Sequence, residues 1–219
     1  MPRAVEPSRD CPRCPRLVAF REAWRAKQPS WFNAPVASFG PADARLLIVG
    51  LAPGLQGANR TGRPFTGDYA GVLLYKTLTE FGFAQGEYQE RPDDGLMLTD
   101  ARISNAVRCV PPENKPTPQE ITTCRDFLIE TIAEMPRLKI IIALGRIAHD
   151  SAVRSLGARL ATVPFGHAAS HQIGRLRLLD SYHCSRYNTN TGVLTEEMFR
   201  AVFRTARGFL DQAEETAPA

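Results

Sequence analysis

The sequence predicts a single α/β domain of three layers, in which helices cover both faces of a central, mainly parallel four-stranded sheet. Short apolar runs typical of buried strands alternate along the chain with longer segments of helical periodicity. The 219 residues, 43% of them hydrophobic, suit one medium-sized core, and no repeat or linker divides them. We expect the domain over residues 11–210, between a flexible arm at residues 1–10 and a frayed tail at residues 211–219.

Each expected element has its own signal. The strands are apolar runs at residues 46–49, 101–110, 139–144 and 176–179. The helices have apolar residues at helical spacing, at residues 17–27, 69–81, 117–132, 147–156 and 195–210. Thr117 begins the third helix as an N-cap, followed by a first-turn proline and by Glu120 at the third helical position. Residues 28–44 and 84–94 are expected to be irregular. In such parallel sheets, ligands bind outside the carboxyl ends of the strands.

The stretch at residues 45–68 carries the clearest candidate site. A buried strand runs into a loop with four glycines, Gly50, Gly54, Gly57 and Gly62. The loop lacks the lysine of a phosphate-binding P-loop and the glycine spacing of the dinucleotide fingerprint. It ends with Phe65 and Asp68, and an aromatic ring and a carboxylate beside a backbone-lined pocket suit a flat polar ring such as a nucleobase. Two interpretations of Asp68 stay open, a helix N-cap and a catalytic group, and one residue can be both.

The five cysteines give a second candidate site. We read the protein as cytoplasmic, so its cysteines are expected to be metal ligands or free thiols, not disulfides. Cys11 and Cys14 have the spacing of metal ligands, and Cys109 and Cys124 lie farther along the chain with fourteen residues between them. From spacing alone, four cysteines can hold zinc or an iron–sulfur cluster, and Cys124 can instead be a core residue. Cys184 is expected to be a free thiol.

Charge and hydropathy set broad limits. The net charge is +4, and residues 1–27 hold seven basic residues against three acidic ones. Such an excess is compatible with nucleic acid, but a solvated helix face explains it equally well. No apolar run approaches the ~18 residues of a membrane span, so we expect no membrane association.

Several motifs together resemble a known family. They are Gly50-Leu51-Ala52-Pro53-Gly54, Gly62-Arg63-Pro64-Phe65-Thr66-Gly67-Asp68, Asn105-Ala106-Val107-Arg108-Cys109, the proline-rich run from Pro111 to Pro118, and Ser181-Tyr182-His183-Cys184-Ser185-Arg186-Tyr187-Asn188. In order and content they resemble the uracil-DNA glycosylase superfamily, most of all its iron–sulfur family 5, also called type b. The resemblance spans roughly residues 11 to 204.

The resemblance implies an activity and a set of roles. A glycosylase of this family flips a deaminated base, uracil and in family 5 also hypoxanthine or xanthine, out of DNA and hydrolyses its N-glycosidic bond. Asp68 orients the water, His183 stabilises the departing base and Asn114 contacts DNA or the water. The base pocket is formed by Gly50, Leu51, Ala52, Gly54, Phe65 and Asn105. DNA is contacted by Arg60, Ser185, Arg186, Tyr187 and Asn188. A structural [4Fe–4S] cluster is held by Cys11, Cys14, Cys109 and Cys124. We expect a monomer.

Two positions keep alternatives open. Other branches carry a polar residue where Ala52 stands, which in family 5 leaves water positioning to Asp68 but also suits an inactive nucleic-acid-binding module of the same fold. Family 5 members often have alanine where Asn105 stands, so Asn105 favours uracil over larger bases. Asn114 is as easily a loop cap as a functional residue. A zinc-stabilised phosphohydrolase lacks the carboxylate or histidine clusters that it would need.

Overall fold

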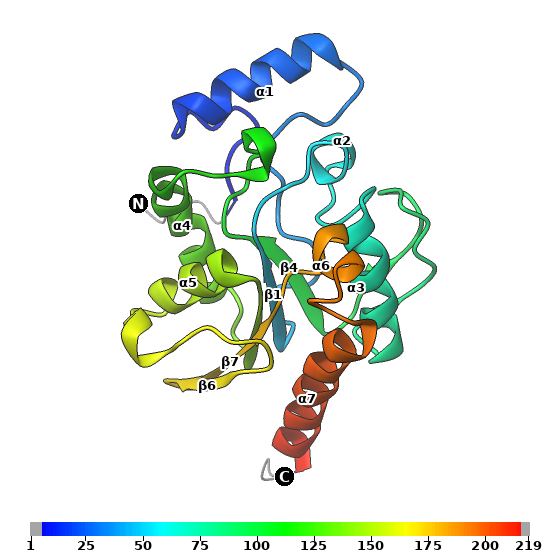
Figure 1. Cartoon of the computed structure of the whole chain (residues 1–219), viewed down its shortest axis with the longest axis vertical. Coiled ribbons are helices and arrows are strands. Elements are labelled where there is room, and N and C mark those ends of the chain that lie inside the picture. The colour runs from blue at the N-terminus through cyan, green and yellow to red at the C-terminus, as the bar shows by residue number, and fades with distance from the viewer. Residues whose placement is uncertain (1–5, 216–219) are drawn as a thin grey trace.

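The structure is a computed structural model that describes residues 6–215, and it is built on a five-stranded sheet (Figure 1). The strand order is β4-β1-β5-β7-β6, formed by β1 (Leu46–Gly50), β4 (Ala101–Asn105), β5 (Ile140–Leu144), β6 (Ser170–Ile173) and β7 (Leu176–Ser181). The strands pair in parallel except for the edge strand β6, which is antiparallel to β7. The predicted fold class is confirmed, with five strands in place of four. The fifth strand, β6, was missed because its polar, half-exposed sequence contains no apolar run.

Helices cover both faces of this sheet, as expected. Leu46 and Ile48 of β1 pack in the core beneath α3 (Tyr69–Glu80) and α7 (Glu196–Glu215). Leu47 and Val49, which point to the opposite face, pack in a second core beneath α4 (Pro118–Ala133) and α5 (Arg146–Ser155). Figure 1 shows α3 and α7 on one side of the strands, and α4 and α5 on the other. A strand buried on both faces explains the continuous apolar run of β1.

The remaining elements are short, apart from α1 (Pro15–Lys27), which lies above α2 in Figure 1. They are α2 (Ala58–Thr61), β2 (Ala84–Gln85), β3 (Met97–Leu98), α6 (Arg186–Asn190) and the 3₁₀ turns η1 (Pro112–Asn114) and η2 (Leu160–Thr162). Sequence periodicity does not detect elements of two to five residues, so these were missed. The predicted Thr117–Glu120 capping box is present, with both of its hydrogen bonds. No helix within residues 6–215 combines the length and the apolar character that crossing a membrane requires.

The two ends of the chain differ from the expectation where the structure describes them. Glu6, in the expected flexible arm, pairs with the buried guanidinium of Arg108 at 2.9 Å and accepts a hydrogen bond from the backbone N–H of Ser38. Residues 211–215, expected to fray, continue helix α7. The rest of the arm (residues 1–5) and of the tail (residues 216–219) lies outside the described residues.

A buried ion pair fixes the segment that follows the glycine loop. The guanidinium of Arg63 forms two hydrogen bonds of 2.7 Å with Asp94, and both side chains are almost fully buried (6% and 0% exposed). Arg63 also lies over the rings of Phe39, Tyr75 and Tyr88. The hydroxyl of Tyr75 donates to the carbonyl of Pro64 at 2.6 Å, and that of Tyr88 donates to the carbonyl of Phe65 at 3.0 Å.

Replacing Asp94 tests this anchor. Asp94→Asn removes the negative charge and leaves Arg63 buried without compensation, which should lower the free energy of unfolding by about 3 kcal/mol or more. The hydrogen bonds from Arg63 hold the pKa of Asp94 well below its ordinary value, so the stabilisation is present at neutral pH and is lost as pH falls toward the folded-state pKa. Urea unfolding at several pH values measures both effects. The control is Asp93→Asn, because Asp93 is 76% exposed and only faces Arg91, so an equal loss there would contradict the expectation.

Candidate active site

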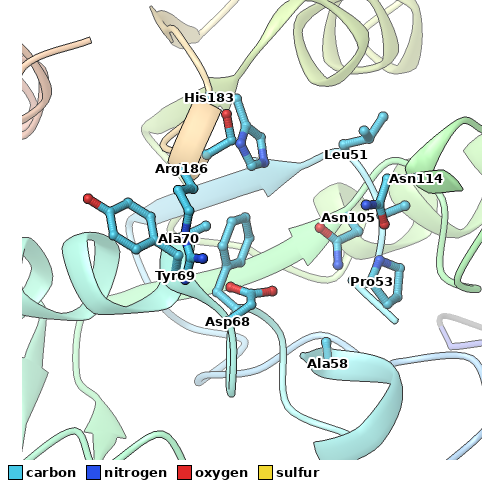
Figure 2. Close-up of a pocket in the computed structure, with 14 residues that line it drawn as sticks. Leu51, Pro53, Ala58, Asp68, Tyr69, Ala70, Asn105, Asn114, His183 and Arg186 are labelled. Carbon is cyan, nitrogen blue, oxygen red and sulfur yellow. The ribbon is translucent and has the colours of Figure 1, made fainter. Parts of the chain in front are cut away.

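A pocket of about 370 Å³ opens at the carboxyl ends of the central strands. Ten of the residues predicted for the site line it: Leu51, Ala52, Gly54, Phe65, Asp68, Asn105, Asn114, His183, Ser185 and Arg186. In Figure 2, Asp68 and His183 lie on opposite sides of the pocket, and Asn105 and Asn114 lie together on a third side. The loops after β1, β4 and β7 therefore converge on one crevice, as a doubly wound sheet predicts.

Gly50 leaves room for the two residues that form the floor of the pocket. It is paired with Asn105 across β1 and β4, and a methyl group on Gly50 would overlap both the Asn105 side chain and the Phe65 ring. Phe65 is buried and has a φ of +52°, a strained conformation for a bulky residue. Its ring centroid lies 6.0 Å from that of His183, with 28° between the planes. The pocket is therefore bounded by near-parallel rings.

Asp68 is both an N-cap and a pocket residue. Its carboxylate accepts a hydrogen bond from the backbone N–H of Gly71 at 3.2 Å at the start of α3, which confirms the capping interpretation. A methyl group on Gly57 would overlap this carboxylate, and one on Gly54 would come within 3.1 Å of it. Burial raises the pKa of Asp68, and the backbone hydrogen bonds from Gly71 and Ala70 only partly offset the shift. The glycines of the loop thus give the carboxylate its place beside the pocket.

His183 presents a neutral imidazole to the same space. Burial lowers its pKa to about 4, and within residues 6–215 its ring nitrogens make no hydrogen bond that would hold a proton. The loop around it is fixed through the backbone, since the side-chain amide of Asn188 donates to the carbonyl of His183 at 2.8 Å. A neutral imidazole can donate one hydrogen bond to a ligand at neutral pH.

Asn105 carries an unsatisfied acceptor into the pocket. The side chain is buried (3% exposed) at the end of β4, and its Oδ1 has no hydrogen-bond partner among the described residues. A buried amide oxygen without a donor is costly unless a ligand supplies one. The position therefore suits a ring with an N–H group, as in a nucleobase.

The rim of the pocket is exposed and cationic. Asn114 lies there on η1 with a φ of +57°, and Ser185 caps α6 by accepting from the backbone N–H of Asn188 at 3.3 Å. The guanidinium of Arg186 lies 5.2 Å from the centre of the Tyr69 ring. Sequence analysis missed four lining residues, Pro53, Ala58, Tyr69 and Ala70, which are apolar or lie beside the motif residues.

Three predicted DNA-contacting residues lie outside the pocket lining. Arg60 is on the exposed side of α2, with one guanidinium nitrogen 3.5 Å from the carbonyl of Gly67. Tyr187 is 74% exposed on α6. Asn188 lines a neighbouring groove and supports His183. These positions leave Arg60 and Tyr187 accessible to a large partner.

The four predicted cluster ligands come together beneath α1. Cys11, Cys14, Cys109 and Cys124 line one small cavity. Burial, and then the charge of neighbouring thiolates, raises the pKa of Cys14 to about 11 and that of Cys109 to about 12. No group of three or more His, Cys, Asp or Glu side chains within residues 6–215 is arranged to hold a metal ion. Cys184 is buried beneath α3, away from this cavity.

The basic excess at the amino terminus is largely neutralised. Arg16 forms two hydrogen bonds with Glu120 at 2.7 and 2.8 Å, and Arg13 pairs with Asp126 at 3.2 Å. Arg25 pairs with Asp10 and Glu22. Two of these pairs join the segment around Cys11 and Cys14 to α4, and the others are made by Arg25 of α1 with Asp10 and Glu22.

The fold and the pocket define a class of protein. A doubly wound α/β domain carries, at its strand ends, stacked rings, an amide with a free acceptor and a carboxylate, and the rim of the pocket is cationic. This combination is characteristic of a protein that binds a nucleobase.

Comparison with known proteins narrows the class. A sequence profile described as the uracil DNA glycosylase superfamily matches residues 37–207. The chain is 44% identical to the type-5 uracil-DNA glycosylase of Thermus thermophilus, over 90% of this chain and 92% of that protein. It is 39% identical to the type-5 enzyme of Pyrobaculum aerophilum (90% and 88% covered) and 42% identical to that of Mycobacterium bovis (90% and 77% covered). The chain belongs to the uracil DNA glycosylase superfamily.

The pKa values of His183 and His149 should be shifted in opposite directions from that of a free histidine. His183 should remain neutral down to about pH 4, and because this pKa is below that of an unfolded histidine, its protonation destabilises the fold as pH drops below about 6.5. Burial opposes the charged form of His149, but its 2.7 Å hydrogen bond to Asp180 and the charge of Asp180 raise its pKa overall. Its contribution to stability is lost as pH rises through the folded-state pKa. Imidazole NMR titration, with each histidine assigned by a His→Gln variant, measures both; a His183 that titrates near pH 6.5 would contradict the burial effect.

Proposed function

We propose that this protein is a monofunctional DNA-repair glycosylase that flips uracil out of DNA and hydrolyses its N-glycosidic bond, leaving an abasic site. The observation that carries the proposal is the pocket in which Phe65, Asn105, Asp68 and His183 converge. The type-5 uracil-DNA glycosylases among its relatives match nearly the whole chain, which supports the same activity.

Recognition of the base rests on Phe65 and Asn105. The Phe65 ring gives the flipped uracil a flat apolar surface to stack on. The unpaired Oδ1 of Asn105 accepts from uracil N3–H, and the amide nitrogen donates to O4, so the ligand satisfies the acceptor that is orphaned in the free protein. This pairing favours uracil, while hypoxanthine and xanthine, which are larger rings, are poorer substrates.

Bond breaking leaves negative charge on the base and positive charge on the sugar. The neutral imidazole of His183 donates a hydrogen bond to uracil O2 as charge develops there, as an oxyanion-hole group does. The ionised carboxylate of Asp68 faces the pocket from the opposite side, where it stabilises the cationic sugar and orients the attacking water. Because burial raises the pKa of Asp68, activity should decline as pH falls toward that pKa from above.

The DNA duplex is held by the exposed residues at the rim. Arg186 supplies a cation beside the mouth of the pocket, and Arg60 supplies another on α2. Tyr187, whose ring is mostly exposed on the five-residue helix α6, is suited to fill the gap that the flipped nucleotide leaves in the stack. Asn114 lines the pocket from η1, where it is suited to contact DNA or the attacking water.

We also propose that Cys11, Cys14, Cys109 and Cys124 hold a [4Fe–4S] cluster with a structural role. Their convergence on one cavity supports this, and so do the donors around them: the backbone N–H of Arg108 lies 3.3 Å from the Cys124 sulfur, and Arg21 lies 4.0 Å from the Cys109 sulfur. Four sulfurs around a single zinc lie about 3.8 Å apart, given Zn–S bonds of about 2.3 Å. Measured sulfur separations would therefore distinguish a single zinc ion from a larger iron–sulfur cluster.

Replacing Asp68 by asparagine separates catalysis from capping. Asparagine is as good an N-cap as aspartate, so the free energy of unfolding should change by less than about 1 kcal/mol. Single-turnover excision of uracil should nevertheless slow by ~10²-fold or more, because the amide cannot offset the cationic sugar. Full activity in Asp68→Asn would show that Asp68 is a helix cap only and that another group orients the water.

Replacing Asn105 tests base recognition. Asn105→Ala should cost about 1–3 kcal/mol of transition-state binding for uracil, a factor of roughly 5 to 150 in kcat/KM. The smaller side chain leaves more room for hypoxanthine, so the ratio of uracil to hypoxanthine excision should fall. Single-turnover rates on matched duplexes measure this ratio. An equal proportional loss on both bases would mean that Asn105 supports the pocket without reading the base.

The cluster proposal has a direct chemical test. The purified protein should be yellow-brown and contain about four irons per chain. Cys109→Ser should lose iron and lower the melting temperature, whereas Cys184→Ser, a matched change at a buried thiol outside the cavity, should keep the iron. A colourless, folded protein with stoichiometric zinc would overturn the proposal.

A further inference from the structure

A second groove lies between α4 and α5, on the side of the sheet away from α3 and α7. It has a volume of about 210 Å³ and is lined from α4 by Arg125 and from α5 by Asp150, Ser151 and Arg154. None of these residues belongs to the pocket or to the cysteine cavity. The chemistry proposed above leaves them without a role.

Arg125 and Arg154 are not matched by acids. The two side chains line the same groove, one from α4 and the other from α5. Within residues 6–215, the side chain of neither forms an ion pair or a hydrogen bond, in contrast to Arg13, Arg16 and Arg25. Two like charges held together without a partner cost free energy that a bound anion recovers.

Buried donors without acceptors face the same groove. Ser151 is 1% exposed, yet its hydroxyl has no partner in the described part of the chain. The Nε of Arg125 is also buried and unsatisfied. The Ser151 hydroxyl and the Arg125 guanidinium both lack acceptors, and the Arg154 guanidinium lines the same groove. The oxygens of a phosphate group can accept hydrogen bonds from all three.

A third groove lies between the α4–α5 groove and the active-site pocket. Ile147, at the start of α5, lines the α4–α5 groove and also this neighbouring groove of about 350 Å³. That neighbouring groove is bounded by Leu51 and His183, which line the pocket as well. Shared lining residues therefore connect the pocket, through this neighbouring groove, to the groove that Arg125 and Arg154 line.

We propose that the α4–α5 groove binds a phosphate of the DNA backbone some distance from the flipped nucleotide, and so extends the DNA footprint beyond the pocket. This proposal rests on the proposed glycosylase function, since DNA is the phosphate source. The contact carries no sequence information; it adds affinity for any duplex and sets the position of the strand relative to His183.

Replacing the acidic residue Asp150 is a control that should change DNA affinity in the opposite direction from replacing an arginine. Asp150 lines the groove, and among the described residues it makes no ion pair with either arginine. A carboxylate repels a phosphate, so Asp150→Asn should tighten duplex binding, by roughly twofold or more at low salt. Damage to the fold does not produce tighter binding.

The principal variant is Arg154→Gln, on an exposed position of α5 away from the cysteines. It should weaken binding of a uracil-free duplex several-fold at low salt. It should also make the plot of log binding constant against log salt concentration less steep by about 0.9, which corresponds to the loss of one phosphate contact. Arg159→Gln, which removes an exposed arginine outside the groove, should leave affinity and slope unchanged. Arg125→Gln should repeat the Arg154→Gln result with an unchanged iron content, a check required because Arg125 follows Cys124.

Fluorescence anisotropy against salt measures the slopes, and single-turnover excision at saturating DNA measures the chemistry. Excision at saturation should be the same in wild type and Arg154→Gln. If wild type fails to excise uracil, the glycosylase proposal fails, but the uracil-free slopes still decide the groove. An Arg154→Gln slope equal to that of wild type overturns the groove proposal, whatever the excision rate.

A last arm separates DNA phosphate from a free anion. Inorganic phosphate is added at constant ionic strength while the melting temperature is followed. If phosphate stabilises wild type but not Arg154→Gln, and the two bind duplex with the same slope, the groove is a free-anion site and the DNA assignment is overturned. A lower slope in Arg154→Gln, together with tighter binding in Asp150→Asn, supports the proposal.

Discussion

The buried pair between Arg63 and Asp94 is the interaction on which the site depends. Arg63 also donates from Nε to the Thr66 hydroxyl at 2.8 Å. One guanidinium therefore fixes Thr66 relative to Arg63 within the segment that ends at Asp68. The strained backbone of Phe65 persists because this pair and the two tyrosine hydroxyls hold the residues around it. Gly71 completes the packing, since a methyl group there would overlap the Phe65 carbonyl and the Tyr88 hydroxyl. Phe65 and Asp68, which belong to the segment that this anchor holds, line the pocket, whereas Arg63 and Asp94 do not.

The same burial acts in opposite senses on the two ionisable groups of the pocket. It raises the pKa of Asp68 and lowers that of His183, because in each case it disfavours the charged form. The protein offsets this for Asp68 alone, through the backbone N–H groups at the start of α3. The result is a carboxylate that can be charged beside an imidazole that stays neutral, which is the division of roles that departure of an anionic base from a cationic sugar requires.

The parts of the fold that the sequence predicts are those whose signals are local. Apolar runs located four of the five strands, and the Thr117 and Asp68 caps marked helix starts correctly. The edge strand β6 was not predicted because its sequence is polar, and its pairing with β7 depends on a turn and on tertiary context.

The convergence of Asn105, Asp68 and His183 was predicted from their places after parallel strands. The unsatisfied oxygen of Asn105 did not, because satisfaction of a polar group depends on neighbours that are distant in sequence. The partners of Arg13 and Arg16 lie about a hundred residues away, so a basic run alone did not reveal that its charges are neutralised.

The ion pairs of Arg13 and Arg16 join parts of the chain that are synthesised at different times. The Arg16–Glu120 and Arg13–Asp126 contacts close loops of 104 and 113 residues. Closing such a loop in the unfolded chain costs about 4 kcal/mol of chain entropy. A ribosome that has released Cys11 and Cys14 must synthesise about a hundred further residues before Cys109 and Cys124 emerge. The amino-terminal segment is thus the first part of the domain to be synthesised, and its partners on α4 follow only after the central strands β1 and β4.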